Sequence, residues 1–203
     1  MNMIAIVDYG VGNIFSLCCS LRYIGADAIL TSDAEVIHRA DRVLLPGVGA
    51  FGDAAARLRS SGLWDVVVAE GKQKPLLGIC LGMQLLLEKS YEYGEHIGLG
   101  LVRGSVVPIA EAVPSGLKIP HIGWNALHFH GEKAPIFKNV AEGEHVYFVH
   151  SYYATDCPTI ATTEYGAELT AAVWDGGYAY GVQFHPEKSG EVGLDILRAF
   201  AEL

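Results

Sequence analysis

The sequence predicts an α/β fold in which a mostly parallel sheet is covered by helices on both faces. Two observations carry this prediction. Over the first 90 residues, short runs rich in β-branched residues alternate with longer segments of helical apolar spacing, which is typical of right-handed βαβ units. After residue 95, short strand-like runs follow one another without helices between them, so we expect an antiparallel or mixed extension.

The first three elements set this alternation. Residues 3–10, MIAIVDYG, form a β-branched run that ends at an acid and a glycine, as expected for a buried strand and its turn. Residues 13–26 place apolar side chains at helical spacing, and Gly25 marks the stop of this helix. Residues 27–32, DAILTS, are expected to form the second strand.

The next elements repeat the pattern and bring glycines to strand ends. Residues 41–53, DRVLLPGVGAFGD, begin as a third strand and run into a loop rich in glycine and proline. Residues 53–72 read as helical. Residues 75–80, PLLGIC, predict a fourth buried strand, and residues 81–90, LGMQLLLEKS, its helix.

The second half predicts strands and a closing helix. A helix is expected over 190–203, and we see no internal repeat, linker or low-complexity stretch. We therefore expect a single domain over residues 1–203. The strand-like runs lie within residues 98–109, 121–130, 145–154, 160–166 and 169–187.

Composition narrows the class of protein. The net charge of −9, from 14 basic and 23 acidic residues, disfavours a broad nucleic-acid surface. Residues 1–13 lack the features of a signal peptide, and no apolar run is long enough to span a membrane. The four cysteines match neither a disulfide framework nor a zinc set, so we expect a cytoplasmic protein with free thiols and without a metal or other cofactor. These cysteines are Cys18, Cys19, Cys80 and Cys157.

Cys80 has the sequence context of a nucleophile. The stretch Gly78-Ile79-Cys80-Leu81-Gly82 is a G-x-C-x-G at a predicted strand-to-helix junction, the cysteine version of the nucleophile elbow. The flanking residues come close to the nucleophile in such a turn and must be small. A helix N-terminus favours the thiolate. The alternative is a buried structural cysteine, which two flanking glycines disfavour.

A histidine and an acid for this cysteine occur together in YGVQFHPEKS, residues 180–189. In extended chain, His185 and Glu187 point the same way, so Glu187 can orient the imidazole while its Nε2 faces a thiol. The alternative is a solvated loop pair, which spacing alone does not exclude. His150, which lies among aromatic residues, is expected to be a core or interface histidine.

The glycine-rich loop at residues 44–53, LLPGVGAFGD, fits an oxyanion site. Attack on an amide or ester produces an oxyanion, which backbone N–H groups must meet. This loop can supply one N–H, and Leu81, directly after the cysteine, a second. The loop lacks the Lys-Ser/Thr of a phosphate-binding P-loop. An ordinary βα turn is the remaining alternative.

Together these segments resemble the class I, or triad-type, glutamine amidotransferases. GICLGMQLL and the downstream HPE are shared across that family. Further segments make the resemblance more specific, to the glutaminase subunits of imidazole glycerol phosphate synthase, and they run in the same order over essentially the whole chain. These segments are VDYGVGN at 7–13, LPGVGAFGD at 45–53, IPHIGWN at 119–125, YFVHSYY at 147–153 and GVQFHPEKSG at 181–190.

The resemblance implies a flavodoxin-like three-layer α/β sandwich with an extended mixed sheet, and it implies a reaction. Cys80 would attack the side-chain amide of L-glutamine, with His185 and Glu187 completing the triad. Ammonia would pass to a (βα)₈-barrel cyclase subunit in a heterodimer. The implied oxyanion amides lie at or near Val48, Gly49 and Leu81.

The resemblance also implies two further sets of residues. The first would hold glutamine and comprises Gly49, Gln84, Glu92, Ser151 and Tyr152. The second would face the partner and comprises Asn13, Trp124, Tyr147 and Lys188. Core packing is the alternative for Trp124 and Tyr147.

Two other functions share part of this pattern. A free-standing cysteine hydrolase on esters or lactones has the elbow, but more often places its acid between nucleophile and histidine in chain order. A non-catalytic binding subunit with a relic site would keep the fold. Labelling of Cys80 by a glutamine-mimicking electrophile would separate the amidotransferase from both.

Overall fold

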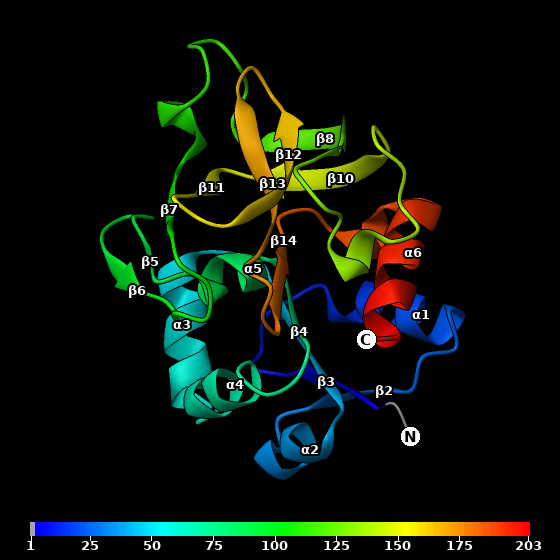
Figure 1. The fold of residues 1–203 in the computed structure, drawn as a ribbon. Coiled ribbons are helices and arrows are strands. Elements are labelled where there is room, and N and C mark those ends of the chain that lie inside the picture. Colours follow the sequence, from blue (N-terminus) through cyan, green and yellow to red (C-terminus); the bar gives the residue numbers. More distant parts are fainter. Residues whose placement is uncertain (1–2) are drawn as a thin grey trace.

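The computed structural model describes residues 3–203 and is built around an eight-stranded mixed sheet (Figure 1). The strand order is β2-β1-β3-β4-β14-β13-β12-β9. The first five strands in this order are mutually parallel: β2 (Ala28–Thr31), β1 (Ile4–Val7), β3 (Arg42–Gly47), β4 (Leu76–Cys80) and β14 (Ala179–Val182). The other three are antiparallel: β13 (Glu168–Trp174), β12 (Thr159–Glu164) and β9 (His128–Phe129).

Two smaller sheets come from the second half of the chain. An antiparallel pair joins β8 (His121–Ala126) to β10 (His145–His150). A four-stranded sheet has the order β11 (Tyr152–Thr155), β7 (Ser105–Pro108), β5 (Lys89–Ser90) and β6 (His96–Ile97). In the view of Figure 1, the β8–β10 pair lies above the parallel strands, and the four-stranded sheet runs down the left-hand side, where β5 and β6 lie beside α5 and α3.

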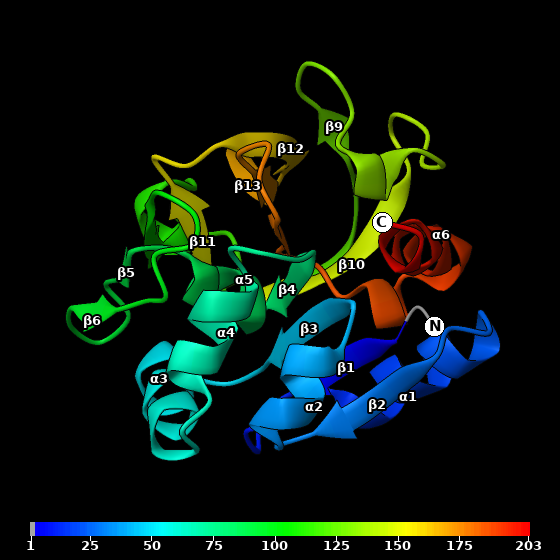
Figure 2. The same ribbon diagram turned by 60° about the horizontal axis from the view of Figure 1, so that its bottom comes forward.

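Helices cover both faces of the parallel strands (Figure 2). One face carries α1 (Ile14–Tyr23) and α6 (Gly190–Ala201). The other carries α2 (Ala34–Arg39), α3 (Phe51–Ser60), α4 (Trp64–Glu70) and α5 (Leu81–Leu86). Three short 3₁₀ turns complete the structure: η1 (Ile109–Glu111), η2 (Pro135–Phe137) and η3 (Pro186–Lys188).

The apolar runs of the buried strands form two separate cores because successive side chains point to opposite faces of the sheet. In β1, Ala5 and Val7 belong to the core under α2–α5, whereas Ile4 and Ile6 belong to the core under α1 and α6. All four side chains are buried. The predicted α/β class, with helices on both faces of a largely parallel sheet, is therefore confirmed.

Two sequence expectations about helices were wrong, and one helix was missed. The predicted helical segment 53–72 is two helices, because Gly62 adopts φ +75° between α3 and α4. The helix expected over 81–90 ends at Leu86, and Lys89–Ser90 instead pair with neighbouring strands as β5. Helix α2 was not expected at all, although Asp33 caps it by accepting a hydrogen bond from the Glu35 amide at 2.9 Å.

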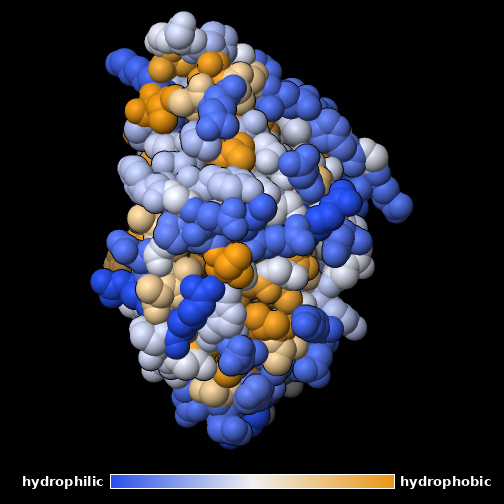
Figure 3. All heavy atoms as spheres, turned by 90° about the vertical axis from the view of Figure 1, so that its left-hand side faces the viewer, coloured by the Kyte–Doolittle hydropathy of each residue, from blue (hydrophilic) through white to orange (hydrophobic). Residues whose placement is uncertain are grey.

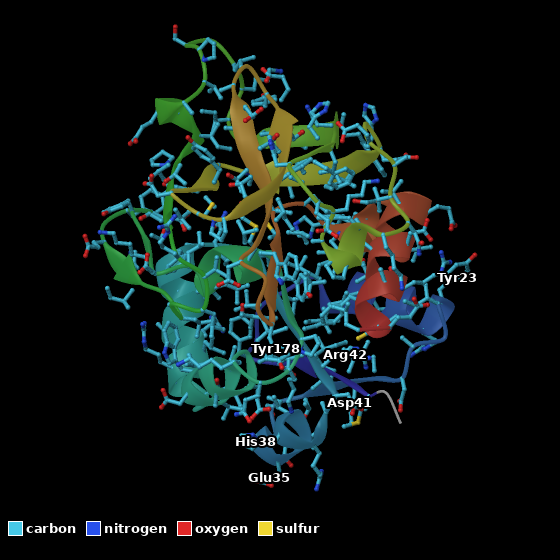
Figure 4. All side chains as sticks on the ribbon, in the orientation of Figure 1. Tyr23, Glu35, His38, Asp41, Arg42 and Tyr178 are labelled. Atoms are coloured by element: carbon cyan, nitrogen blue, oxygen red, sulfur yellow. The ribbon has the colours of Figure 1, made fainter. Side chains whose placement is uncertain are left out.

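A buried carboxylate ties α2 to α4 at the amino-terminal side of the sheet. Glu70 contacts His38 Nδ1 and Lys74 Nζ, each at 2.6 Å. Lys74 also donates to the carbonyls of Ile37, His38 and Ala40, where α2 ends. Burial alone would raise the pKa of Glu70, but its contacts with Lys74 and His38 outweigh burial and lower it. Figure 4 shows His38 on α2, at the opposite end of the molecule from β8 and β10.

Ligand sites of α/β sheets lie at the carboxyl ends of the parallel strands. On the face shown in Figure 3, hydrophobic atoms occur in small groups among hydrophilic ones. No helix within residues 3–203 is long and apolar enough to cross a membrane. Residues 1 and 2 lie outside the described residues. They belong to the predicted domain 1–203 and to the segment 1–13, in which no signal peptide was expected.

Candidate active site

Cys80 lies at the tip of a tight strand-to-helix turn. It is the last residue of β4 and directly precedes α5, with φ +55° and ψ −111°. Only three residues other than glycine in the described chain have positive φ, so this backbone is held by its surroundings.

The glycines that flank the turn are required by close packing. A Cβ on Gly82 would lie 1.8 Å from the carbonyl oxygen of Leu45 in β3. A Cβ on Gly78 would lie 2.7 Å from the carbonyl of Gly82. The absence of both side chains lets α5 approach β3 and β4, and this presents the thiol at the carboxyl edge of the sheet.

His185 and Glu187 are joined by a short hydrogen bond. Nδ1 of His185 lies 2.7 Å from Oε1 of Glu187, and both side chains are almost fully buried. The expectation of extended chain between them was wrong: Pro186–Lys188 form a 3₁₀ turn, with Pro186 at its first position. The hydroxyl of Ser189 donates to the His185 carbonyl at 2.6 Å and closes this turn.

Asn13 adds a contact that the sequence did not indicate. Its Nδ2 donates to Oε1 of Glu187 at 3.1 Å, the same oxygen that faces His185. The residue had been expected to face a partner, and it is half-buried at the start of α1. Asn13 therefore helps to fix the carboxylate from a position 174 residues away in the sequence.

The local charges favour a protonated His185. Burial alone would lower the pKa of His185, but the hydrogen bonds and charges of Cys80 and Glu187 outweigh burial and raise the pKa to about 10. Nδ1–H then donates to Glu187, and the imidazolium stabilises a thiolate on Cys80. An ion pair of this kind is the reactive form of a cysteine nucleophile.

One pocket of about 280 Å³ brings the expected residues together. Cys80 and His185 line it, and Glu187 lies behind His185. The three residues of the expected oxyanion site, Val48, Gly49 and Leu81, also line it. So does the whole expected glutamine-binding set: Gly49, Gln84, Glu92, Ser151 and Tyr152.

Hydrogen bonds fix several of these lining residues. Glu92 Oε2 accepts from the amide of Phe51, the first residue of α3, at 2.5 Å. Gln84 Nε2 donates to the carbonyl of Tyr152 at 3.2 Å. Gly49 adopts φ +94°, with open space where a Cβ would stand. The pocket wall is therefore largely preformed, and its loop side depends on a glycine conformation.

A hydrogen bond from Tyr9 fixes the end of β3, just before Gly49. The hydroxyl of Tyr9 donates to the carbonyl of Pro46 at 2.7 Å. Burial, together with the charge of Cys80, raises the pKa of Tyr9 far above its usual range, so this hydroxyl stays protonated as a donor.

The other residues expected to face a partner form one surface cluster, which we call the aromatic cluster: Trp124, Tyr147 and Lys188. Tyr147 and Trp124 are directly opposite in the β8–β10 pair, with ring centroids 6.0 Å apart. Lys188 Nζ lies 5.7 Å from the Tyr147 ring. Trp124 is 53% exposed, which excludes core packing as its role.

Two polar residues of the site were not identified from the sequence. His150, expected in the core or an interface, lines the pocket, and its Nδ1 donates to the Tyr152 carbonyl at 2.8 Å. Burial lowers the pKa of His150 to about 3, so it is neutral. Gln183 is fully buried between Cys80 and Gln84. The sequence did contain a signal for Gln183, because it is a lone amide between the apolar residues Val182 and Phe184, directly after β14.

The described part of the chain shows no metal centre. Among residues 3–203, no group of three or more His, Cys, Asp or Glu side chains is placed to hold a metal ion.

The arrangement at Cys80 is suited to nucleophilic attack on a carbonyl carbon, with a proton supplied from His185 to the leaving group.

Comparison with solved structures agrees with the fold. The chain resembles PurLQS from Thermotoga maritima, with a TM-score of 0.75, 20% identity and coverage of 98% of this chain and 97% of that chain. It also resembles the glutaminase domain of CTPS from Trypanosoma brucei, solved with bound acivicin, with a TM-score of 0.67, 16% identity and coverage of 100% and 94%.

Comparison with known sequences is more specific. The model of the family "Glutamine amidotransferase class-I" matches residues 5–202. The imidazole glycerol phosphate synthase subunit HisH of Caldanaerobacter subterraneus subsp. tengcongensis is 47% identical over 99% of this chain and 98% of its own. The same subunit of Methanothermobacter thermautotrophicus is 48% identical, with the same coverage. The chain therefore belongs to the class I glutamine amidotransferase family, within the group of HisH subunits of imidazole glycerol phosphate synthase.

Proposed function

We propose that the chain is a glutaminase domain that hydrolyses L-glutamine and passes the ammonia to a cyclase partner. The observation that carries this proposal is the pocket in which Cys80 and His185 meet the whole expected glutamine-binding set. Its volume of about 280 Å³ lies at the small end of ligand sites, as suits an amino acid. The chain order Cys80, His185, Glu187 also differs from that of α/β-hydrolases, where the acid precedes the histidine.

The first half-reaction forms a thioester. The Cys80 thiolate attacks the side-chain carbonyl carbon of glutamine, and a C–S bond forms while the carbonyl oxygen becomes an oxyanion. Backbone amides at or near Val48, Gly49 and Leu81 meet this charge. The imidazolium of His185 gives its proton to the nitrogen, the C–N bond breaks, and ammonia leaves.

The second half-reaction restores the thiolate. His185, now neutral, takes a proton from a water molecule that attacks the γ-glutamyl thioester. The C–S bond breaks, glutamate leaves, and the thiolate–imidazolium pair is present again. Glu187, held at 2.7 Å from Nδ1, keeps the imidazole in the tautomer that both steps need.

The remaining lining residues hold the substrate. Glu92 is the carboxylate in the pocket wall and provides a site for the α-ammonium group of glutamine. The backbone of Ser151 and Tyr152 is available for the α-carboxylate. Gln84 lies beside Cys80 and can bind the side-chain amide.

We propose the aromatic cluster as the site where the partner binds. Aromatic residues are enriched in interfaces, and Lys188 is adjacent in sequence to Glu187, so a contact there can reach the triad. The partner is the (βα)₈-barrel cyclase subunit in a heterodimer. It would combine the ammonia with a phosphoribulosyl formimino-carboxamide nucleotide, PRFAR, and release imidazole glycerol phosphate and the aminoimidazole carboxamide nucleotide AICAR in histidine biosynthesis. We place this assembly in the cytoplasm, where the four free cysteines stay reduced.

The test is glutamate release from glutamine, measured for the chain alone, with the cyclase subunit, and with the cyclase and its nucleotide substrate. We expect little release by the chain alone and a large rise in the complete mixture. Equal release in all three mixtures would make the chain an independent glutaminase and contradict the partner proposal. No release in any mixture would favour a hydrolase of other substrates or a relic site.

A further inference from the structure

Gln183 is the fully buried polar residue that directly contacts the nucleophile. Its Nε2 lies 3.7 Å from Cys80 Sγ, within reach of an N–H···S hydrogen bond, and its Oε1 lies 3.0 Å from Nε2 of Gln84. Burying a side-chain amide without hydrogen-bond partners costs free energy of folding. Both the oxygen and the NH₂ group of Gln183 have a partner. One side chain thus connects the thiol to a residue of the substrate pocket.

The orientation of the Gln183 amide is fixed, through Gln84, by the backbone carbonyl of Tyr152. The carbonyl oxygen of Tyr152 can only accept hydrogen bonds, and it faces both His150 Nδ1 at 2.8 Å and Gln84 Nε2 at 3.2 Å. Gln84 must therefore turn its NH₂ group toward Tyr152. The second hydrogen of that NH₂ group points to Gln183, which must answer with its oxygen. Gln183 is then left with its NH₂ group facing the sulfur.

This orientation matters for the charge of the sulfur. A thiol can donate its proton to the carbonyl of Val149, which lies 3.9 Å from Sγ, whereas a thiolate gains nothing from that carbonyl. A thiolate instead gains from the N–H of Gln183, since hydrogen bonds to charged groups are the stronger ones. The Val149 contact therefore favours the thiol and the Gln183 contact favours the thiolate.

We infer that Gln183 is a positioning residue that stabilises the Cys80 thiolate and, by accepting a hydrogen bond from Gln84, helps to hold Gln84 in the orientation that the Tyr152 carbonyl sets. The inference deepens the proposed function and rests on it for the identity of the substrate. With its NH₂ group committed to Tyr152 and Gln183, Gln84 has its oxygen free for the NH₂ group of a bound glutamine side chain.

Two substitutions separate these two effects. Gln183→Glu keeps an oxygen for Gln84 but replaces the N–H donor with a second oxygen, so the thiolate is disfavoured while substrate binding is retained. Gln183→Met has similar length and loses both contacts. The matched control is Gln73→Met, because Gln73 is a surface glutamine whose Nε2 donates only to the Ala69 carbonyl.

The readout is the pH dependence of Cys80 alkylation by iodoacetamide, followed by mass spectrometry of the Cys80 peptide. Cys19 is exposed in the same chain and serves as the internal reference for reagent activity. For Gln183→Met we expect the midpoint to rise by about one pH unit and alkylation at pH 7 to slow about tenfold. Gln183→Glu should show at least the same rise, and Gln73→Met none.

Steady-state kinetics of the complex supplies the second readout. Gln183→Met should raise KM for glutamine as well as lower kcat, whereas Gln183→Glu should lower kcat with KM close to that of the unsubstituted chain. Alkylation needs no glutamine turnover, so it tests Gln183 even if the proposed glutaminase activity fails.

Thermal melting checks that each variant is folded. If both Gln183 variants fail to fold, Gln84→Met serves instead, since it removes the group that fixes the Gln183 amide and lies in the wall of an open pocket. Its midpoint should rise by a smaller amount. An alkylation midpoint that stays within about 0.2 pH units of the unsubstituted chain in every folded variant of these two glutamines would overturn the inference.

Discussion

The elbow around Cys80 makes a sharp prediction about Gly82→Ala. The added Cβ would lie 1.8 Å from the Leu45 carbonyl oxygen, whereas ordinary contact begins at 3.4 Å. Helix α5 and strand β3 would therefore have to separate by roughly 1.6 Å, taken from those two distances. The clash is with a buried backbone carbonyl. No flexible side chain can therefore move aside to relieve it.

The expected magnitudes follow from this displacement. Overpacking of a buried site costs about 2–3 kcal/mol, which lowers Tm by about 4–12 °C for a chain of this size. The larger effect is on the reaction. A misplacement of about 1 Å at a catalytic group can cost about 100-fold in rate, so kcat/KM for glutamine in the complex should fall at least that far while most of the chain stays folded.

The control is Gly25→Ala, which strains the backbone without a clash. Gly25 adopts φ +74° at the end of α1, with no atom within 4 Å of the place where a Cβ would stand. A left-handed alanine costs about 1–2 kcal/mol, so Tm should fall in this variant while kcat/KM stays unchanged. If Gly82→Ala kept the kcat/KM of the unsubstituted complex, the steric reasoning about the elbow would be refuted.

Three further predictions concern charge and the partner. Glu187→Gln should lower kcat about 10,000-fold. The native rate should decline as pH rises through about 10, where His185 loses its proton, and the decline of the variant should begin at lower pH. Trp124→Ala should weaken cyclase binding about 30-fold in Kd, or about 2 kcal/mol, by calorimetry. Glu70→Gln should cost about 1–2 kcal/mol in urea unfolding at pH 7. That difference should shrink as pH falls below about 4.5. The pKa of Glu70 is lower in the folded chain than in the unfolded chain, so the stability that its carboxylate contributes is lost when the group is protonated in acid.

Two matched controls accompany the Glu187 and Trp124 predictions. Glu191→Gln removes an exposed carboxylate near Arg198 and should leave the pH profile unchanged. Tyr178→Ala removes an exposed aromatic residue at the opposite end of β14 from the pocket (Figure 4) and should leave cyclase binding unchanged. The reasoning fails if Glu187→Gln keeps the native pH profile, if Trp124→Ala binds as tightly as Tyr178→Ala, or if the Glu70→Gln difference grows in acid.

The parts of the fold that could be predicted are those encoded by local patterns. The β-branched run of β1 and the apolar run of β4 identify buried strands because sheets with both faces covered leave little room for polar residues. The elbow could be predicted because its steric demand falls on Gly78 and Gly82, two residues on either side of Cys80. In each case the cause and the residue lie within a few positions of each other.

The remainder depends on contacts that the sequence does not display. Asn13 meets Glu187 across 174 positions, and Gln183 meets Cys80 across 103. Nothing periodic connects such pairs, so only the packed sheet brings them together. The break at Gly62 and the 3₁₀ turn at Pro186 were missed for a different reason: helical and extended patterns tolerate a single glycine or proline until the backbone angles are known.

The most direct test of the proposed chemistry is the site of covalent labelling by 6-diazo-5-oxo-norleucine, a glutamine-mimicking electrophile. The chain with its cyclase subunit should form one adduct, on the Cys80 peptide, and excess glutamine should prevent it. Cys80→Ser should form none. Labelling of Cys19 in place of Cys80, or no labelling of the native complex, would contradict the assignment of Cys80 as the nucleophile that attacks glutamine.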